Sequence, residues 1–275
     1  MQAKKSLGQN FLNSKAVARD IVRAADLTLT DTVLEIGPGK GFLTHELLAS
    51  GARVVAVEKD ARMIPLLTKK FAEATTEKRF VLIHGDIVEL LEKNTLVLPL
   101  HYKLVANIPY YITGYVLRAF LETNRASKDG ARHDFVKSKP ERMILMLQKE
   151  VADRIVARDK KESILSIATK AYGTPRIVKK VPARYFTPAP KVDSAVLSIT
   201  DISNKNFPNA ASEKRFFEIM KTGFAHKRKQ LAGNLKDLLG DETKKLLAQS
   251  AIPLNARAED LPLEKWLALT KNAHK

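Results

Sequence analysis

The chain has 275 residues and carries 47 lysines and arginines against 30 aspartates and glutamates, which gives a formal net charge of +17. Its hydrophobic share of 45% excludes a disordered protein, and the absence of cysteine excludes a disulfide scaffold, a thiol nucleophile and a thiolate zinc site. No apolar run approaches the ~18 residues of a membrane helix and no signal peptide opens the chain, so we expect a cytoplasmic protein without membrane contact.

Short apolar segments alternate with amphipathic ones through the first two thirds of the chain, which is typical of an α/β domain. The predicted parallel strands are Thr32–Ile36, Arg53–Val57, Phe80–His84, Lys103–Ala106 and Arg142–Leu147. The helices between them are predicted to start at Phe42, Asp60, Ile87 and Thr113. Two further strands, Ile177–Val181 and Ser194–Thr200, are expected to form an antiparallel pair at the edge of this sheet.

Helical patterns dominate the rest of the chain. The segment 201–211 is rich in Asn, Ser and Pro and has the composition of a linker. After it we predict the helices Ser212–Phe224, Arg228–Leu239, Asp241–Ser250 and Leu263–Asn272, with Ser212 and Asp241 as N-caps. We therefore expect residues 1–203 to form an α/β domain and residues 204–275 a small, all-helical domain.

A glycine-rich turn follows the first predicted strand. Gly37, Gly39 and Gly41 lead directly into a helix, and glycines at such a turn allow a ligand to approach the backbone closely. The spacing is one residue short of the dinucleotide fingerprint, and Glu35 precedes the turn by two residues. A carboxylate there disfavours a pyrophosphate and suits a cofactor with a cationic methionine portion. We therefore predict S-adenosylmethionine, and a nicotinamide-dependent dehydrogenase is the weakest alternative.

Acidic residues also close the next two strands. Glu58 stands where α/β nucleotide-binding folds place a carboxylate for the ribose hydroxyls, and Asp86 is positioned to accept from an adenine amine. Their neighbours Lys59 and Ile87 are expected in the same cofactor site. Ligands of such sheets bind at the carboxyl ends of the strands, so the glycine turn and both acids should meet there.

The fourth strand runs into Asn107-Ile108-Pro109-Tyr110, which resembles the (Asn/Asp)-Pro-Pro-(Tyr/Phe) signature of amino methyltransferases, and this resemblance implies an adenine amine as the methyl acceptor. The amide oxygen of Asn107 and the carbonyl of Pro109 could each accept one N–H of an adenine amine and so position its nitrogen for attack on a methyl group. Tyr110 would stack on one face of the base and Phe186 on the other. We expect Asn107, Pro109 and Tyr110 to be catalytic, with Asn107 also at the cofactor.

These residues carry a resemblance that extends along nearly the whole chain. The matching segments are 7–12 (LGQNFL), 107–110 (NIPY), 146–154, 186–196 and 224–235. The set resembles the ribosomal RNA adenine N6,N6-dimethyltransferases, which include the KsgA-type enzymes of the small ribosomal subunit and the Erm macrolide-resistance enzymes. The resemblance implies a Rossmann-like class I S-adenosylmethionine methyltransferase fold, with a seven-stranded, mainly parallel sheet and one antiparallel edge strand. It also implies that Gln9, Asn10 and Leu12 contact the cofactor, that residues 1–203 are the methyltransferase domain and that residues 204–275 are the helical RNA-binding domain.

The positive charge indicates where RNA would bind. One cluster of basic residues surrounds Phe186 and includes Lys191; another holds Lys227, Arg228 and Lys229. Lys4, Lys5 and a basic stretch at 125–139 are further candidates, and the last is an insertion relative to the family pattern. By resemblance, we expect a monomeric, metal-free enzyme that dimethylates two adjacent adenosines in a 3'-terminal hairpin of 16S rRNA and acts in subunit biogenesis. An Erm-type 23S rRNA enzyme and a ribosome-assembly factor with secondary catalysis remain the alternatives.

Overall fold

A computed structural model describes residues 9–122 and 138–273 of the chain. It divides into two compact units, each described separately below. The first holds the chain up to Ala152 together with Thr174–Ile202, and the second holds Asp153–Gly173 together with Ser203–Lys275. Within the described ranges no helix is long and apolar enough to cross a bilayer.

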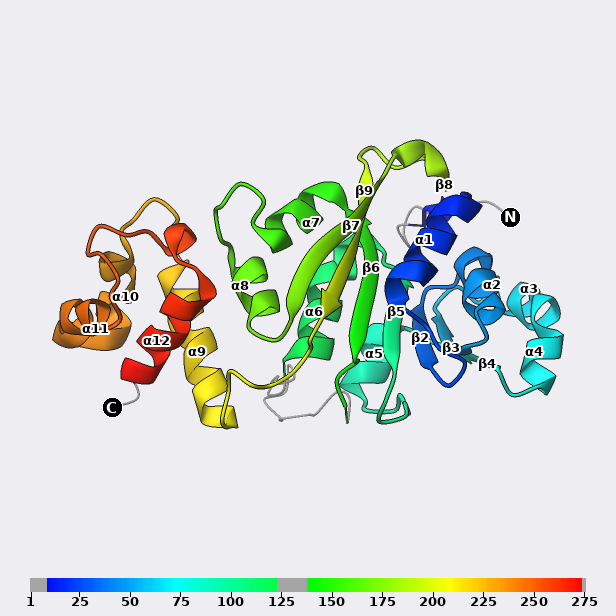
Figure 1. Cartoon of the computed structure of the whole chain (residues 1–275), viewed down its shortest axis with the longest axis horizontal. Helices are drawn as coiled ribbons and strands as arrows, with labels where there is room; N and C mark the ends of the chain where they lie inside the picture. The colour runs from blue at the N-terminus through cyan, green and yellow to red at the C-terminus, as the bar shows by residue number, and fades with distance from the viewer. Residues whose placement is uncertain (1–8, 123–137, 274–275) are drawn as a thin grey trace. The chain divides into compact units, whose positions relative to one another are not determined.

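The first unit is built on a seven-stranded sheet with the strand order β4-β3-β2-β5-β6-β9-β7 (Figure 1). Its strands are β2 (Thr32–Ile36), β3 (Arg53–Glu58), β4 (Phe80–His84), β5 (Lys103–Asn107), β6 (Arg142–Gln148), β7 (Thr174–Val181) and β9 (Ser194–Thr200). The first five pair in parallel, whereas β9 is antiparallel to both β6 and β7. The predicted mainly parallel, seven-stranded sheet is confirmed. Its antiparallel strand lies one place inside the edge, which β7 occupies.

Helices cover both faces of this sheet, which explains why its central strands are almost entirely apolar. They are α1 (Lys15–Ala25), α2 (Phe42–Ala49), α3 (Ile64–Lys70), α4 (Ala72–Thr76), α5 (Ile87–Glu92) and α6 (Thr113–Leu121), followed by α7 (Lys149–Val156) at the unit boundary. In the view of Figure 1, α1 lies in front of the sheet and α6 behind it. The helix predicted to start at Asp60 begins only at Ile64, because a turn closed by Met63 N–H donating to the Asp60 carbonyl (2.8 Å) precedes it.

A second sheet of two very short strands holds the N-terminal segment. Strand β1 (Phe11–Leu12) pairs antiparallel with β8 (Phe186–Thr187), placing Leu12 opposite Phe186. Both of these side chains are buried in the hydrophobic core of the first unit. Residues far apart in the sequence are thereby joined beside the carboxyl ends of the parallel strands.

The second unit is helical. It contains α8 (Ile164–Lys170), α9 (Ala210–Gly223), α10 (Leu231–Leu239), α11 (Thr243–Gln249) and α12 (Leu263–Asn272). The fully buried Trp266 lies so close to Gly223 that a methyl group there would come within 2.5 Å of the indole. Helix α8, from the predicted methyltransferase domain, contacts α9 and belongs to this unit. The functional division at residue 203 stays a prediction.

Three predicted helix starts in this unit were wrong. The helix predicted from Arg228 begins only at Leu231, the first residue of α10. Asn209, three residues before Ser212, is the N-cap of α9, and its side chain accepts from Ser212 N–H (2.9 Å). Asp241 lies in a 3-10 turn (Gly240–Glu242) ahead of α11. At α9, Asn209 and Ser212 are both good capping residues, and the sequence does not show which of them serves.

Candidate functional site

The glycine turn connects β2 to α2 through three residues with positive φ angles, +70° at Gly37, +56° at Gly39 and +70° at Gly41. Only glycine adopts such angles without strain. A methyl group on Gly39 would come within 2.9 Å of the Phe11 ring, and one on Gly41 within 2.5 Å of the Phe71 ring. Gly37 and Gly39 line a pocket, whereas Gly41 lies outside the pocket lining and packs the start of α2 against α3.

Glu58 at the end of β3 lies directly beside this turn. Its carboxylate accepts from Gly39 N–H at 2.9 Å and from Asp60 N–H at 2.7 Å. Burial raises the pKa of the carboxyl, and these two donors oppose that rise. Glu58 therefore lies against the glycine turn, as the sequence predicted.

Asp86 at the end of β4 caps helix α5 by accepting from Val88 N–H (2.9 Å). Its second carboxylate oxygen pairs with the ammonium of Lys59 at 2.7 Å, and this bond raises the pKa of Lys59. Lys59, Asp86 and Ile87 all line the pocket, as the sequence predicted.

Glu35 is the most unusual group in the pocket wall. Its side chain is 0% exposed, and no described donor meets full hydrogen-bond geometry with either carboxylate oxygen; the Thr44 hydroxyl interacts with the carboxyl and acts to lower its pKa. Burial, with a smaller contribution from the nearby Glu58, raises the pKa of the Glu35 carboxyl from 4.5 to about 8. In the free protein at neutral pH the Glu35 carboxyl is therefore mostly protonated, because a buried carboxylate is costly, and a cationic ligand group beside it would favour the ionised form.

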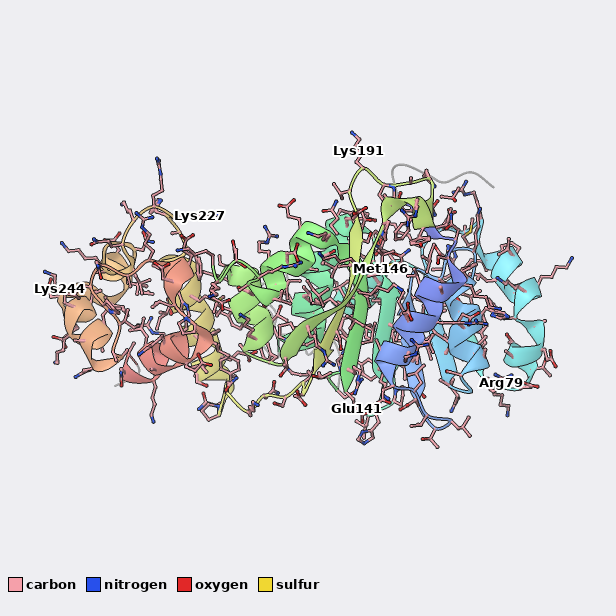
Figure 2. The ribbon with its side chains drawn as sticks, turned by 45° about the horizontal axis from the view of Figure 1, so that its top comes forward. Arg79, Glu141, Met146, Lys191, Lys227 and Lys244 are labelled. Carbon is pink, nitrogen blue, oxygen red and sulfur yellow. The ribbon has the colours of Figure 1, made fainter. Side chains whose placement is uncertain are left out.

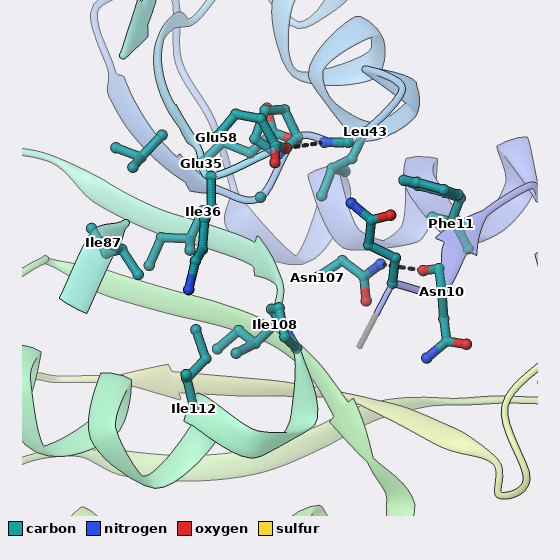
Figure 3. A pocket seen from close by; sticks show the side chains of 18 of the residues that line it. Asn10, Phe11, Glu35, Ile36, Leu43, Glu58, Ile87, Asn107, Ile108 and Ile112 are labelled. Atoms are coloured by element: carbon teal, nitrogen blue, oxygen red, sulfur yellow. Dashed lines mark hydrogen bonds between the residues drawn. The ribbon is translucent and has the colours of Figure 1, made fainter. Parts of the chain in front are cut away.

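The tetrapeptide after β5 forms the opposite wall (Figure 3). The side-chain N–H of Asn107 donates to the carbonyl of Asn10 at 3.1 Å, while its amide oxygen accepts no hydrogen bond from any described residue. The Pro109 carbonyl already accepts from Ile112 N–H (3.1 Å), and the Ile108 carbonyl accepts none among the residues described. Asn107 therefore presents an oriented acceptor, with backbone carbonyls next to it.

Tyr110 follows these acceptors and is half-buried. Its hydroxyl lies 2.9 Å from the Ser194 hydroxyl, and burial raises the pKa of the phenol. The bond to Ser194 fixes the ring at the pocket wall. Tyr111, which the sequence analysis did not select, also lines the pocket and is 62% exposed.

The N-terminal segment completes the enclosure. Gln9, Asn10, Phe11 and Leu12 all line the pocket. The ring of Phe11 lies beneath the ammonium of Lys40, 4.9 Å from its centroid. Sequence analysis selected the three other residues but missed Phe11, whose only signal was its place between two of them.

One pocket therefore brings together every predicted cofactor residue except Gly41. The apolar walls that sequence analysis missed are Ile36, Pro38, Phe42, Leu43, Val57, Ile108 and Ile112. Three carboxylates and an apolar lining suit a ligand with an adenine, a ribose and a cationic end, and the buried Glu35 fits S-adenosylmethionine in particular. Among the described residues, no group of three or more His, Asp or Glu could hold a metal ion.

The predicted RNA contacts lie elsewhere. Phe186 is 3% exposed and packs in the core, so its ring lies outside the pocket lining. Lys191 in the first unit is exposed, and so are Lys227, Arg228 and Lys229, which form the basic turn before α10 in the second. Figure 2 shows Lys191 and Lys227 extending away from the ribbon. The candidates Lys4 and Lys5 and all of the 125–139 stretch except its last two residues lie outside the described residues.

Comparison with known proteins identifies the family. A model described as ribosomal RNA adenine dimethylase matches residues 1–275. The chain is 42% identical to Ribosomal RNA small subunit methyltransferase A of Dehalococcoides mccartyi (strain CBDB1), over 98% of this chain and 88% of the relative. It is 40% identical to the protein of the same name from Thermosynechococcus vestitus, over 98% of this chain and 97% of the relative.

A solved structure of the 23S rRNA methyltransferase ErmE matches with a TM-score of 0.74, covering 97% of this chain and 100% of that one. At 24% sequence identity, this likeness shows the shared fold. The match of the family model over the full length and the relatives at 40–42% identity agree with each other. The chain belongs to the ribosomal RNA adenine dimethylase family.

Proposed function

We propose that this protein transfers methyl groups from S-adenosylmethionine to the N6 amines of two adjacent adenosines in a 3'-terminal hairpin of 16S rRNA, giving N6,N6-dimethyladenosine, and acts in subunit biogenesis. The observation that carries the proposal is the Asn107 amide, whose nitrogen is bound to Asn10 while its oxygen is left open at the pocket wall. The relatives at 40–42% identity, which are named for the small ribosomal subunit, favour 16S rRNA over the 23S substrate of an Erm-type enzyme.

The pocket residues divide the work of holding the cofactor. Glu58 would accept from the ribose hydroxyls, Asp86 from the adenine amine, and Glu35 would face the cationic methionine end. Gln9, Asn10 and Leu12 would enclose that end, and the backbone of Gly37 and Gly39 allows a close approach. When bound, S-adenosylmethionine supplies an electrophilic methyl group.

The target adenine needs its amine held in line. Asn107 Oδ1 accepts one N–H, and a carbonyl of the following turn accepts the other. The Ile108 carbonyl is an additional candidate to the predicted Pro109 carbonyl, because the latter already accepts from Ile112. Both acceptors favour the positive charge that develops on the nitrogen as it attacks. Tyr110 offers a stacking face for the extruded base.

The net charge of +17 supports RNA as the substrate. Lys191 and the basic turn are exposed cations that would bind phosphates without selecting sequence. For Phe186 to stack on the base, its ring would have to leave the core in which it packs. We infer a monomeric protein acting in the cytoplasm, where the small ribosomal subunit is assembled.

Mass spectrometry of rRNA after incubation with the enzyme and isotope-labelled cofactor tests the proposal. We expect labelled N6,N6-dimethyladenosine in the 16S RNA of unmethylated 30S subunits and none in 23S RNA. Labelling of 23S RNA without 30S labelling would establish the Erm-type alternative instead. The Asn107→Ala variant serves as the matched control, since it should bind 30S subunits without labelling them.

A further inference from the structure

A buried carboxylate outside the predicted site holds the N-terminal segment. Asp60 has a side chain only 2% exposed, and one of its oxygens accepts from the Gln9 amide at 2.8 Å. Arg62 donates to the same carboxylate from Nε (2.9 Å) and from a terminal nitrogen (2.5 Å). That terminal nitrogen also lies 3.4 Å from the Gln9 side-chain oxygen. Gln9, Asp60 and Arg62 thus form a closed triangle of side chains, which we call the Asp60 triad.

The Asp60 triad is a costly arrangement for a merely structural turn. Removing a carboxylate from water disfavours its charged form unless several donors replace the lost hydration. Here Arg62 supplies that replacement and holds the pKa of the Asp60 carboxyl well below its usual range. The charge is therefore retained at neutral pH, and its remaining hydrogen-bonding capacity is directed at Gln9.

The segment beginning at Gln9 is fixed at both ends. The Asp60 triad holds Gln9, and the pairing of Phe11 and Leu12 with β8 holds the other end. Asn10 lies between these two anchors, and its carbonyl is the group that accepts from the Asn107 amide. A carbonyl fixed from both sides fixes the direction of the amide that binds to it. Because the carbonyl only accepts, the Asn107 nitrogen must face it and the amide oxygen must face away.

The same turn also reaches the cofactor side of the pocket. The backbone N–H of Asp60 donates to Glu58, whose other oxygen is bound to Gly39 N–H. Asp60 therefore contacts both the carboxylate expected at the ribose and the segment that orients Asn107.

We propose that Asp60 is a positioning residue that acts through Gln9 and the Asn10 carbonyl to orient the Asn107 amide toward the substrate amine. The proposal rests on the proposed function, because it assigns Asn107 Oδ1 as the acceptor. Loss of the triad frees the Gln9 end of the segment, so that the Asn10 carbonyl moves and the Asn107 amide samples the reversed orientation. In that orientation an N–H group faces the substrate amine and repels it.

Kinetics separate this role from general support of the fold. The Asp60→Ala variant should lower kcat by about 10- to 100-fold, the size expected from misplacing a reacting group, and change KM for 30S subunits by less than about 2-fold. Asp60→Asn should recover much of the loss, because after the Gln9 amide flips the two amides can pair. The control is Glu77→Gln. Glu77 and Arg79 form an ion pair that matches Asp60 and Arg62 in sequence separation and in length (2.5 Å), but this pair does not contact the segment that begins at Gln9.

Gln9→Ala removes the same link and keeps the Asp60–Arg62 ion pair, so it tests the proposal even if Asp60→Ala folds poorly. Gln9→Ala should also lower kcat. The double variant, Gln9→Ala with Asp60→Ala, should have the same kcat as Asp60→Ala alone, because both changes break the same Gln9–Asp60 hydrogen bond. Equal kcat values for Gln9→Ala and Glu77→Gln would overturn the proposal. So would additive losses in the double variant.

A structural measurement keeps this result apart from the proposed function. Crystal structures of the wild type and of Gln9→Ala should show the Asn107–Asn10 bond in the first and its loss, beyond 3.5 Å by the usual criterion, in the second. An intact bond in the variant would refute the positioning role whatever the activity. Absence of methyl transfer by the wild type would instead contradict the proposed function and leave the structural comparison decisive for Asp60.

Discussion

Replacing Glu35 by glutamine should change how the stability of the protein depends on pH. The Glu35 side chain is fully buried, and its pKa is raised from 4.5 to about 8, mainly by burial. Below pH 4.5 the carboxyl is protonated in both the folded and the unfolded chain, so it costs nothing. Between pH 4.5 and 8 the unfolded chain releases this proton while the folded chain keeps it, so the free energy of unfolding falls as pH rises. Above pH 8 the loss is complete.

The interval from 4.5 to about 8 sets the size of this effect. It lowers the free energy of unfolding by about 3 kcal/mol at pH 7, about 4 kcal/mol at pH 8 and about 5 kcal/mol at higher pH. A glutamine at this position has almost the same shape and no proton to release. The Glu35→Gln variant should therefore gain stability relative to the wild type as pH rises, and show no such gain near pH 4.5.

Urea unfolding of the cofactor-free protein at pH 5, 6, 7 and 8 measures this difference. Glu73→Gln, at an exposed position in α4, is the matched control and should follow the wild type at every pH. A difference between the wild type and Glu35→Gln that stays constant from pH 5 to pH 8 would refute the reasoning. It would mean that the Glu35 carboxyl titrates alike in the folded and unfolded chain.

Three further predictions follow from the site. Gly41→Ala should lower the free energy of unfolding by about 2–4 kcal/mol, because the added methyl group meets Phe71 at 2.5 Å. Gly37 has the same φ but no neighbour nearer than 4.0 Å, so Gly37→Ala should lower it by only about 1 kcal/mol. Thermal unfolding of both variants checks this difference. Tyr110→Ala should lower methyl transfer about 10-fold or more by removing the stacking face, and Tyr110→Phe should lose far less; equal losses would contradict stacking. Each alanine in the basic turn should reduce the salt dependence of RNA binding by about 0.7–0.9 in the log–log slope, with cofactor affinity unchanged in calorimetry.

Most of the sheet could be predicted because a buried parallel strand leaves a strong signal in the sequence. Thr32–Ile36 and Phe80–His84 match to the residue, and the prediction for the fourth strand stopped one residue short of Asn107. The pairing of β1 with β8 could not be predicted, since two residues show no periodicity and the paired Leu12 and Phe186 lie 174 positions apart. In the second unit the start of α9 was misplaced because Asn209 and Ser212 are both good capping residues.

The site shows the same division. Two of the acids that line the pocket, Glu58 and Asp86, follow strands of the sheet and could be located from their spacing alone. The packing role of Gly41 could not be predicted. In a sequence, a glycine that leaves room for a ligand looks the same as one that leaves room for the ring of Phe71. Asp60 was equally hidden, since only the folded chain brings it to Gln9. Distant contacts of this kind are set by packing and leave no local pattern.

The orientation of one amide is the central claim, and a single-turnover comparison tests it most directly. The measurement is the rate of methyl transfer to 16S adenosines in 30S subunits, at saturating enzyme and cofactor, for the wild type and for Asn107→Ala. Removing the acceptor should slow transfer by about 100-fold or more while 30S binding is retained. Transfer by Asn107→Ala at the wild-type rate would contradict the account.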